Sequence, residues 1–261
     1  MSMSYVVGDK FDRCTKLKSC ITYSEFLEKY RNRELDVSIQ NGIQYYPGQG
    51  LQEEQIKVFL KEIEGRKLSK HFYVWYHMLS NYKASEKLTH KRYGENRLIT
   101  EPQNIAIDTY EMDLVINDKN EIMSDHVTGY HLQGMLLIEA ARQSFLAVTE
   151  KYFVPKELDF KSYFVIKKME VNFISFVFPF DTKIVYNILD KDIKDPLKLN
   201  FSICVGIHQM DQIATSIDID FSVFHKPWFE TIEQKKAERC LLYYMQKYSD
   251  ENNANEFSAS Y

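Results

Sequence analysis

The sequence contains few cysteines, and none of them falls in a paired pattern. Cys14, Cys20, Cys204 and Cys240 are the four cysteines in 261 residues, and no C-x-x-C motif occurs. Structural zinc sites and small disulfide-rich folds both depend on such spacings. The pattern therefore predicts neither of them, and it indicates reduced thiols in a cytoplasm.

Long apolar runs and an excess of basic residues are also absent. No uncharged apolar stretch approaches the roughly 20 residues that cross a bilayer, and the start, MSMSYVVGDKFDR, has no basic segment followed by an apolar run. The 33 Lys and Arg residues are outnumbered by 37 Asp and Glu residues, for a net charge of -4, whereas domains that bind nucleic acid are usually basic. We expect a cytoplasmic protein that binds neither membrane nor nucleic acid, with enough apolar residues (44%) for a sizeable core.

Residues 1–89 have a mixed pattern and are predicted to form an accessory region. Residues 22–31 are typical of a short capped helix, and residues 50–65 place apolar side chains on one helical face, with Gly65 as the stop. The aromatic segment HFYVWYHMLSNY, 71–82, is expected to pack against the main domain. Residues 80–97 carry five Lys or Arg against two Glu, which fits either a solvated linker or a docking surface for an acidic partner or a phosphate.

Alternating apolar residues predict strands in the rest of the chain, on both sides of one apolar helix at about 132–152. The predicted strands lie within 110–116, 167–178, 182–189, 199–208 and 217–224. Because consecutive strands without intervening helices form antiparallel sheets, we predict an α+β domain whose sheet covers the helix. A surface helix and a frayed polar tail, 251–261, are expected to follow.

The predicted helix carries charges where a core helix should be apolar. On a helix, Glu139 lies beside Arg142 and Gln143, so the three polar groups share one side. An unpaired buried charge would cost several kcal/mol, so each group needs a partner or a cavity. Two interpretations remain open, a buried ion pair completed by Gln143 or one wall of a functional site.

The segment before this helix adds groups that could do chemistry. Asp125, His126 and His131 lie in an irregular stretch with two glycines, and Gly134 leaves the helix start accessible. A helix N-terminus can hold a carbonyl oxygen or an oxyanion, and an imidazole and a carboxylate can move protons. Zinc bound by the two histidines with Asp125 or Glu139 is the rival interpretation. No helical H-x-x-x-H pair or cysteine supports it, so we predict no metal.

These residues resemble a known family. DHVTGYHLQGMLLIEAARQSF, 125–145, is similar to the signature of A-factor biosynthesis (AfsA-like) hotdog proteins, whose best-known members are γ-butyrolactone synthases. The matching elements are Asp125 to Val127, Gly134 with Met135, and Glu139 to Gln143. THKRYGENRLIT, 89–100, resembles the motif that opens the hotdog repeat. The segment also resembles hotdog 3-hydroxyacyl carrier-protein dehydratases, in which a histidine and a helical glutamate are catalytic, while Arg142 favours the A-factor type.

The resemblance implies a hotdog fold, an antiparallel sheet wrapped around one long helix, and substrates that are acyl thioesters of a carrier protein or coenzyme A. For synthases of this type it implies transfer of a β-ketoacyl group to dihydroxyacetone phosphate, in autoregulator (quorum-signalling) or secondary-metabolite biosynthesis. No cofactor is implied. The catalytic residues implied are Glu139, Arg142 and His126. The substrate-binding residues implied are Gly134, Met135, Gln143, Asp125, His131, Lys91 and Arg92.

Known synthases carry two tandem hotdog repeats, whereas only one Glu-Ala-x-Arg-Gln motif occurs here. Because the hotdog site lies between two such units, the resemblance implies a homodimer. We expect an accessory region over 1–89, the hotdog domain over 90–226, and a C-terminal helix and tail over 227–261. The alternatives to an acyltransferase are a hydratase or dehydratase (a lyase) and a non-catalytic hotdog that binds an acyl chain.

Overall fold

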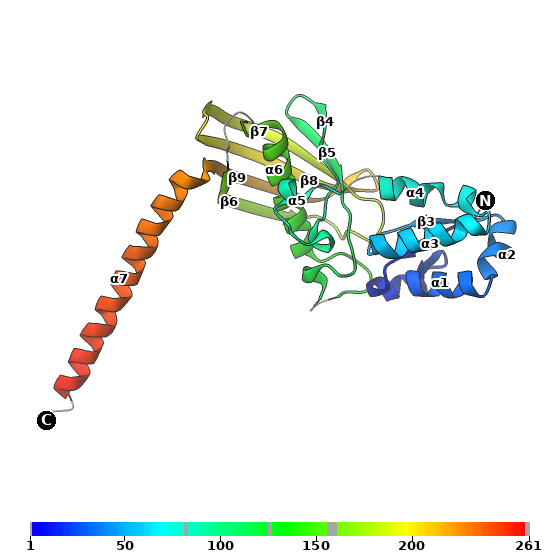
Figure 1. The fold of residues 1–261 in the computed structure, drawn as a ribbon, viewed down its shortest axis with the longest axis horizontal. Helices are drawn as coiled ribbons and strands as arrows, with labels where there is room; N and C mark the ends of the chain where they lie inside the picture. Colours follow the sequence, from blue (N-terminus) through cyan, green and yellow to red (C-terminus); the bar gives the residue numbers. More distant parts are fainter. Residues whose placement is uncertain (1, 81–82, 125–126, 156–160, 259–261) are drawn as a thin grey trace.

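The computed structural model describes residues 2–80, 83–124, 127–155 and 161–258, with side chains described as far as Ser249. Its main unit is an antiparallel sheet that packs against helix α6, Gly134–Tyr152 (Figure 1). The strands lie in the order β4-β5-β7-β8-β9-β6. They are β4 Gln103–Ala106, β5 Thr109–Asp113, β6 Ser162–Phe173, β7 Lys183–Asp195, β8 Lys198–Gln209 and β9 Gln212–His225. The predicted α+β sheet around one helix is confirmed.

The apolar periodicity of the sequence explains how this unit packs. Along β9 every second residue from Ile217 to Val223 is buried against α6, and Phe221 stacks on Phe145 with ring centroids 4.6 Å apart. One predicted inward residue, Phe173, is instead 56% exposed, because it is the last residue of the edge strand β6; its ring lies against the start of α6 at Gly134. The alternating pattern therefore predicted the inward-facing residues of the strands correctly, except at the end of β6.

Residues 2–80 form a second unit, which includes a small parallel sheet that the sequence did not predict. Its strands are β1 Ser2–Val7, β2 Cys20–Thr22 and β3 Ile43–Pro47, in the order β2-β1-β3. The helices around them are η1 Asp9–Lys16, α1 Tyr23–Arg31, α2 Glu34–Gln40, α3 Glu53–Gly65, η2 Ser69–His71 and α4 Tyr73–Ser80. The predicted caps hold, since Thr22 and Glu25 form a reciprocal capping box and α3 ends at Gly65.

The described part of the aromatic segment, 71–80, packs within this second unit, so the expectation that it packs against the main domain is wrong there. Trp75 is fully buried, stacks on Phe26 with centroids 5.1 Å apart, and donates from Nε1 to the carbonyl of Tyr45 at 2.9 Å. The aromatic rings belong to a core separate from that of the main sheet. Composition alone predicted burial, but it could not tell which of the two cores would provide it.

The chain after β3 joins the two units. Gln49 donates from Nε2 to the carbonyl of Leu114 and accepts from the amide of Ile116, each at 2.8 Å. Gly50 follows at φ 85°, and a Cβ there would lie 2.5 Å from Asp118 Oδ1. Only glycine fits this backbone conformation and this approach. These contacts attach the accessory unit to the edge of the main sheet near β5.

Asp118 at this junction is expected to make stability depend on pH. It is 8% exposed, its Oδ1 has no hydrogen-bond partner among the described residues, and burial raises its pKa to about 6. A raised carboxyl pKa stabilises the fold at low pH, and this contribution is lost as the pH rises from about 4 through 6. Asp118→Asn should therefore stabilise the protein by roughly 2–3 kcal/mol at pH 7.5.

Urea unfolding of the wild type and Asp118→Asn at pH 7.5 and at pH 4 would measure this effect. The low-pH pair is the internal control, since the wild-type carboxyl is then largely neutral and the two proteins should be nearly equal in stability. A variant that is less stable than the wild type at pH 7.5 would contradict the prediction.

The remaining helices are α5 Glu86–Thr89, η3 Gly94–Asn96, η4 Glu121–Met123 and α7 Lys226–Ser258. Figure 1 shows α7 projecting away from the sheet. The frayed tail expected from residue 251 is wrong as far as Ser258, which is helical. No glycine or proline interrupts the chain after Pro227. The polar residues of this segment therefore form a solvated helix and not a frayed tail. None of the helices in the described ranges has both the length and the apolar character needed to cross a bilayer.

Candidate active site

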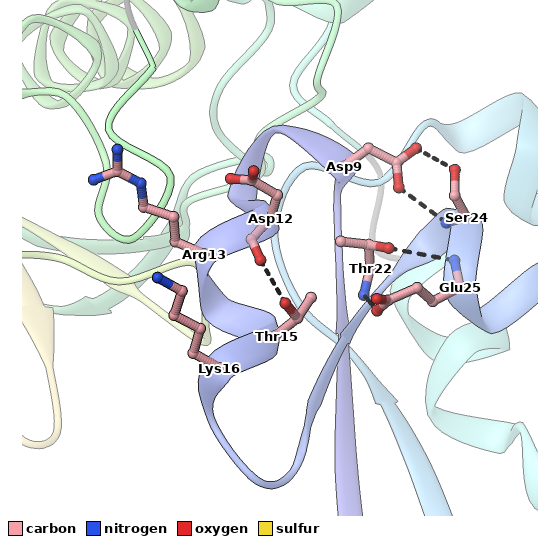
Figure 2. Close-up of a pocket in the computed structure, with 8 residues that line it drawn as sticks. All are labelled: Asp9, Asp12, Arg13, Thr15, Lys16, Thr22, Ser24 and Glu25. Atoms are coloured by element: carbon pink, nitrogen blue, oxygen red, sulfur yellow. Dashed lines mark hydrogen bonds between the residues drawn. The ribbon is translucent and has the colours of Figure 1, made fainter.

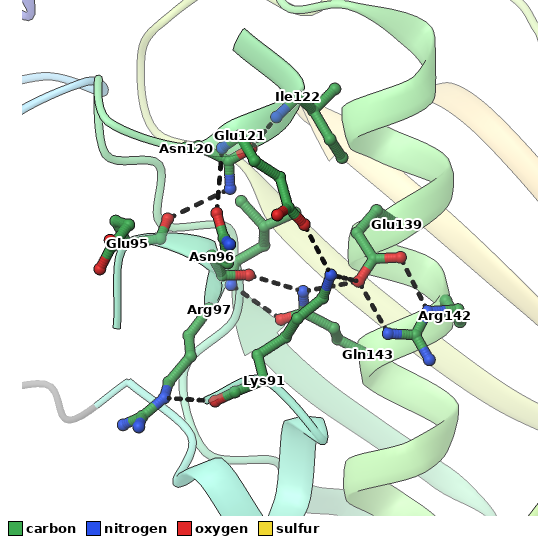
Figure 3. A network of polar contacts seen from close by, with 11 residues as sticks. Lys91, Glu95, Asn96, Arg97, Asn120, Glu121, Ile122, Glu139, Arg142 and Gln143 are labelled. Atoms are coloured by element: carbon green, nitrogen blue, oxygen red, sulfur yellow. Dashed lines mark hydrogen bonds and ion pairs between the residues drawn. The ribbon is translucent and has the colours of Figure 1, made fainter. Parts of the chain in front are cut away.

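Glu139, Arg142 and Gln143 project from one side of α6 toward residues 91–98 (Figure 3). They form, with Lys91, what we call the Glu139 cluster. Arg142 donates from Nε to Glu139 Oε2 at 2.7 Å and from Nη2 to Oε1 at 2.9 Å. The one-turn spacing of a helix brings these groups together, and a parallel pair of charge-assisted bonds fixes their orientation. The predicted ion pair is therefore present.

Gln143 fixes the segment that faces the helix. Its side chain is fully buried and donates from Nε2 to the carbonyl of Asn96 at 2.8 Å, while its Oε1 accepts from the amide of Leu98 at 2.8 Å. A third bond runs from Nε2 to Glu139 Oε1 at 3.0 Å. One buried amide thus satisfies two backbone groups of a neighbouring segment and orients the carboxylate.

Glu139 is held as an ionised carboxylate. Lys91 Nζ lies 3.3 Å from its Oε1, in addition to the bonds from Arg142 and Gln143. Burial pushes the pKa of Glu139 upward, but the hydrogen bonds from Arg142 and Gln143 and the two cations outweigh it and hold the pKa below its usual value. A carboxylate accepts about four hydrogen bonds, so four donors leave it little capacity to take a proton.

Arg142 faces two ways. One edge of its guanidinium holds Glu139, and its side chain is still 32% exposed. Among the described residues Nη1 has no bond, so one edge of the fork remains for an anion. Arg142 can therefore both orient Glu139 and bind a negatively charged ligand.

The start of α6 lies between apolar side chains. The ring of Phe173 approaches Gly134 so closely that a Cβ there would be 2.7 Å from Cζ. The next residue, Met135, is exposed. Gly134 thus lets the Phe173 ring lie close to the helix start, a contact that the sequence-based interpretation of an accessible helix terminus did not include.

The other predicted residues lie around the Glu139 cluster or outside the described part of the chain. His131 contacts the ring of Phe176 at 4.5 Å and forms no bond with the Glu139 cluster in the described residues. Arg92 is exposed beside Tyr93. Asp125 and His126 lie outside the described residues. The structure therefore brings together four predicted residues, Lys91, Glu139, Arg142 and Gln143.

Two residues of this network were missed at the sequence level. Asn96 accepts at Oδ1 from the amide of Glu121 at 3.0 Å, and Glu121 in turn lies 3.0 Å from Lys91 Nζ (Figure 3). Both residues occur in polar stretches without a periodic pattern. Nothing local marks them, because their partners are distant in the sequence.

A second polar surface lies at η1 and the start of α1. Figure 2 shows that Asp9 accepts from Ser24 and that Thr22 pairs with Glu25. These bonds cap and hold α1. Across the ranges that the structure describes, no three His, Cys, Asp or Glu side chains gather in a way that could hold a metal ion.

Comparison with known families decides which kind of protein carries this arrangement. The sequence model of the A-factor biosynthesis hotdog domain (AfsA) matches residues 81–225, more than half of the chain. The chain belongs to this family. The hotdog helix is then α6, and the Glu139 cluster lies on it within the matched residues.

Solved structures resemble the hotdog domain in fold. A dehydratase heterocomplex from Xenorhabdus doucetiae is 12% identical with a TM-score of 0.42, over 54% of this chain and 90% of that one. A mutant thioesterase from Pseudomonas aeruginosa is 10% identical with a TM-score of 0.35, over 48% and 81%. A protein from Helicobacter felis is 18% identical with a TM-score of 0.36, over 55% and 90%. No curated protein sequence matches the chain.

Proposed function

We propose that this AfsA-family hotdog protein is an enzyme acting on acyl thioesters, and that it transfers a β-ketoacyl group from a carrier protein or coenzyme A to a small hydroxylated acceptor such as dihydroxyacetone phosphate. Family membership supports the thioester substrate. The observation that carries the transfer reaction is the half-free guanidinium of Arg142, next to an ionised carboxylate and a second cation, Lys91. An exposed guanidinium edge suits a phosphate on the acceptor.

In the proposed reaction the acceptor hydroxyl attacks the carbonyl carbon of the thioester, the C–S bond breaks, and the hydroxyl proton passes to the departing thiolate. Arg142 and Lys91 would bind the acceptor phosphate, and Glu139 would orient both cations. The N–H groups at Gly134 and Met135 would polarise the carbonyl. We assign the proton transfer to His126, with Asp125, His131 and Arg92 as the further binding residues. Gln143, which was also predicted to bind substrate, is fully buried and would instead hold Glu139 in place. Neither a cofactor nor a metal enters this scheme.

The saturated carboxylate favours transfer over dehydration. In a dehydratase a glutamate and a histidine exchange protons with the substrate, and Glu139 has four donors on it and a lowered pKa. A group held ionised in this way is a poor proton shuttle near neutral pH. Its geometry suits an orienting role.

Mass spectrometry of products would test the proposal. The protein is incubated with β-ketoacyl carrier protein or β-ketoacyl coenzyme A, with and without dihydroxyacetone phosphate, and separately with an enoyl thioester. The expected result is loss of thioester and a new acyl ester only when the acceptor is present. Hydration of an enoyl thioester without acceptor would show a hydratase instead, and retention of the acyl ligand with no turnover would show a binding protein.

We also propose that the enzyme is a homodimer formed through β6. This strand lies at an edge of the sheet, and its exposed apolar side chains include Ile166 (42%) and Phe173. A long, apolar edge strand usually pairs with another chain. The pairing would place a partner subunit beside Phe173 and the start of α6, which completes a site of the hotdog type.

Charges on this edge are expected to separate the subunits. Size-exclusion chromatography with light scattering should give twice the mass of one chain for the wild type and a single-chain mass for Ile166→Lys/Phe173→Lys, since two buried ammonium groups would face the partner. Ile107→Lys, at a fully solvated turn on the opposite side of the sheet, is the matched control and should remain dimeric. A monomeric wild type, or a dimeric double variant, would refute this interface.

A further inference from the structure

A cavity of about 620 Å³ lies between the accessory unit and the main sheet. Its walls come from β3, α3 and α4 on one side and from the chain around β5 and the start of β7 on the other. Glu139, Arg142 and Gln143 do not line it. We propose that this cavity binds a small organic carboxylate with an apolar body, at a site separate from the proposed acyl-transfer site.

Lys83 supplies the charge at one end of the cavity. Within the described residues its ammonium group forms no ion pair, and its one hydrogen bond is a long one, 3.5 Å, to the carbonyl of Gly94. Burial lowers the pKa of Lys83. The Glu53 and Glu95 carboxylates oppose this effect, and the neighbouring Arg97 adds to it. A desolvated ammonium group beside a second cation is stabilised by an anion. We therefore expect a negatively charged group to bind at the Lys83 end of the cavity.

The other lysines of the cavity wall already have their partners. Lys57 lies 2.7 Å from Glu53 and 3.0 Å from Glu54, and Lys183 lies 2.8 Å from Asp113. A ligand anion would have to break these pairs to bind there. Lys83 has no such competitor in the described chain, so the anion is expected at its end of the cavity.

Apolar side chains form much of the remaining wall. Tyr46, Leu51, Met78, Leu79 and Val115 line the cavity. An apolar wall does not stabilise a small hydrated anion such as phosphate, but it does stabilise a hydrocarbon chain or a ring. The volume is in the range that holds small organic ligands. The charge of Lys83 and the apolar wall together favour an amphipathic carboxylate, for which octanoate is a suitable probe.

Isothermal titration calorimetry of the full chain with octanoate tests the proposal. A dissociation constant on the order of 0.1 mM is expected for the wild type. Lys83→Met keeps an unbranched side chain that is one atom shorter and removes the charge, and it should weaken binding roughly ten-fold or more. Val115→Phe should abolish binding by filling the cavity, because Val115 is only partly buried and holds its place through its backbone amide. Circular dichroism verifies that both variants are folded.

Lys57→Met is the matched control, because it removes a lysine from the same wall whose charge is already paired, and it should leave the dissociation constant within about two-fold of the wild-type value. Octanol and inorganic phosphate should each bind at least about ten-fold more weakly than octanoate. No heat of binding for octanoate at millimolar concentration would overturn the proposal. Binding that survives both Lys83→Met and Val115→Phe would also overturn it, since the ligand would then lie elsewhere.

Discussion

Glu139→Gln is expected to lower kcat/KM for acyl transfer by about two orders of magnitude. The carboxylate accepts from both donors that Arg142 directs at it, and it lies 3.3 Å from Lys91. A glutamine presents an amide N–H₂ to one of these donors, so the guanidinium loses its fixed position. Steady-state rates over a range of acceptor concentrations would measure the loss, which should include a raised KM for the acceptor.

Glu150→Gln is the matched control for this experiment. Glu150 is a carboxylate on the same helix, its side chain is 8% exposed, and it pairs with His90 at 3.0 Å. The change removes one buried charge three turns from Glu139, so kcat/KM should change by less than about two-fold. Equal losses in the two variants would mean that Glu139 acts through helix stability and not on the reaction.

The pH dependence of stability further distinguishes the contribution of Glu139 to stability from its contribution to the reaction. Because the pKa of Glu139 is lowered, its ionised form contributes stability that is present above the usual glutamate value and is lost as the pH falls below it. The wild type should therefore lose more stability than Glu139→Gln between neutral pH and pH 4 or below. This difference reports on the ion pair alone, whatever the rate of transfer.

Gln143→Leu is expected to destabilise the protein by about 3 kcal/mol. The fully buried amide is the partner of the Leu98 N–H and the Asn96 carbonyl, and a leucine would leave both backbone groups without a bond in the core. Each unsatisfied buried group costs about 1–3 kcal/mol. Urea unfolding followed by circular dichroism would measure the change in the free energy of unfolding.

Gln133→Met provides the contrast for this variant. The Nε2 of Gln133 is buried and has no partner among the described residues, and its side chain makes no capping bond at the start of α6. Removing this amide should leave the stability unchanged or slightly raised. If Gln143→Leu were as stable as the wild type, the assignment of Gln143 as the anchor of residues 96–98 would be wrong.

Periodicity in the sequence was sufficient to predict the main unit. The alternation through Ile217, Ile219 and Phe221 and the apolar helix over 134–152 lead to an antiparallel sheet on one helix, because each pattern has a single face that must be buried. The cap formed by Thr22 and Glu25 could also be predicted from the sequence, since a capping box involves residues only three apart.

The parallel sheet of the accessory unit escaped prediction for a physical reason. Its strand β2 has three residues, too few to show an alternation, and its partner β1 is separated from it by the irregular helix η1. Parallel pairing also depends on which segments meet after the chain has folded back. The cavity that holds Lys83 exists only because this unit docks on the main sheet.

The sequence by itself determined that Glu139, Arg142 and Gln143 share one face of a helix, because the 3.6-residue period is a local property of the backbone. Only the tertiary structure decided what that face meets. Gln143 bonds to backbone groups 45 and 47 residues away, and Lys91 reaches Glu139 from the same distant segment. Such contacts form when separate elements pack together. No local pattern records that Arg142 holds Glu139 while its Nη1 has no bond to any described residue.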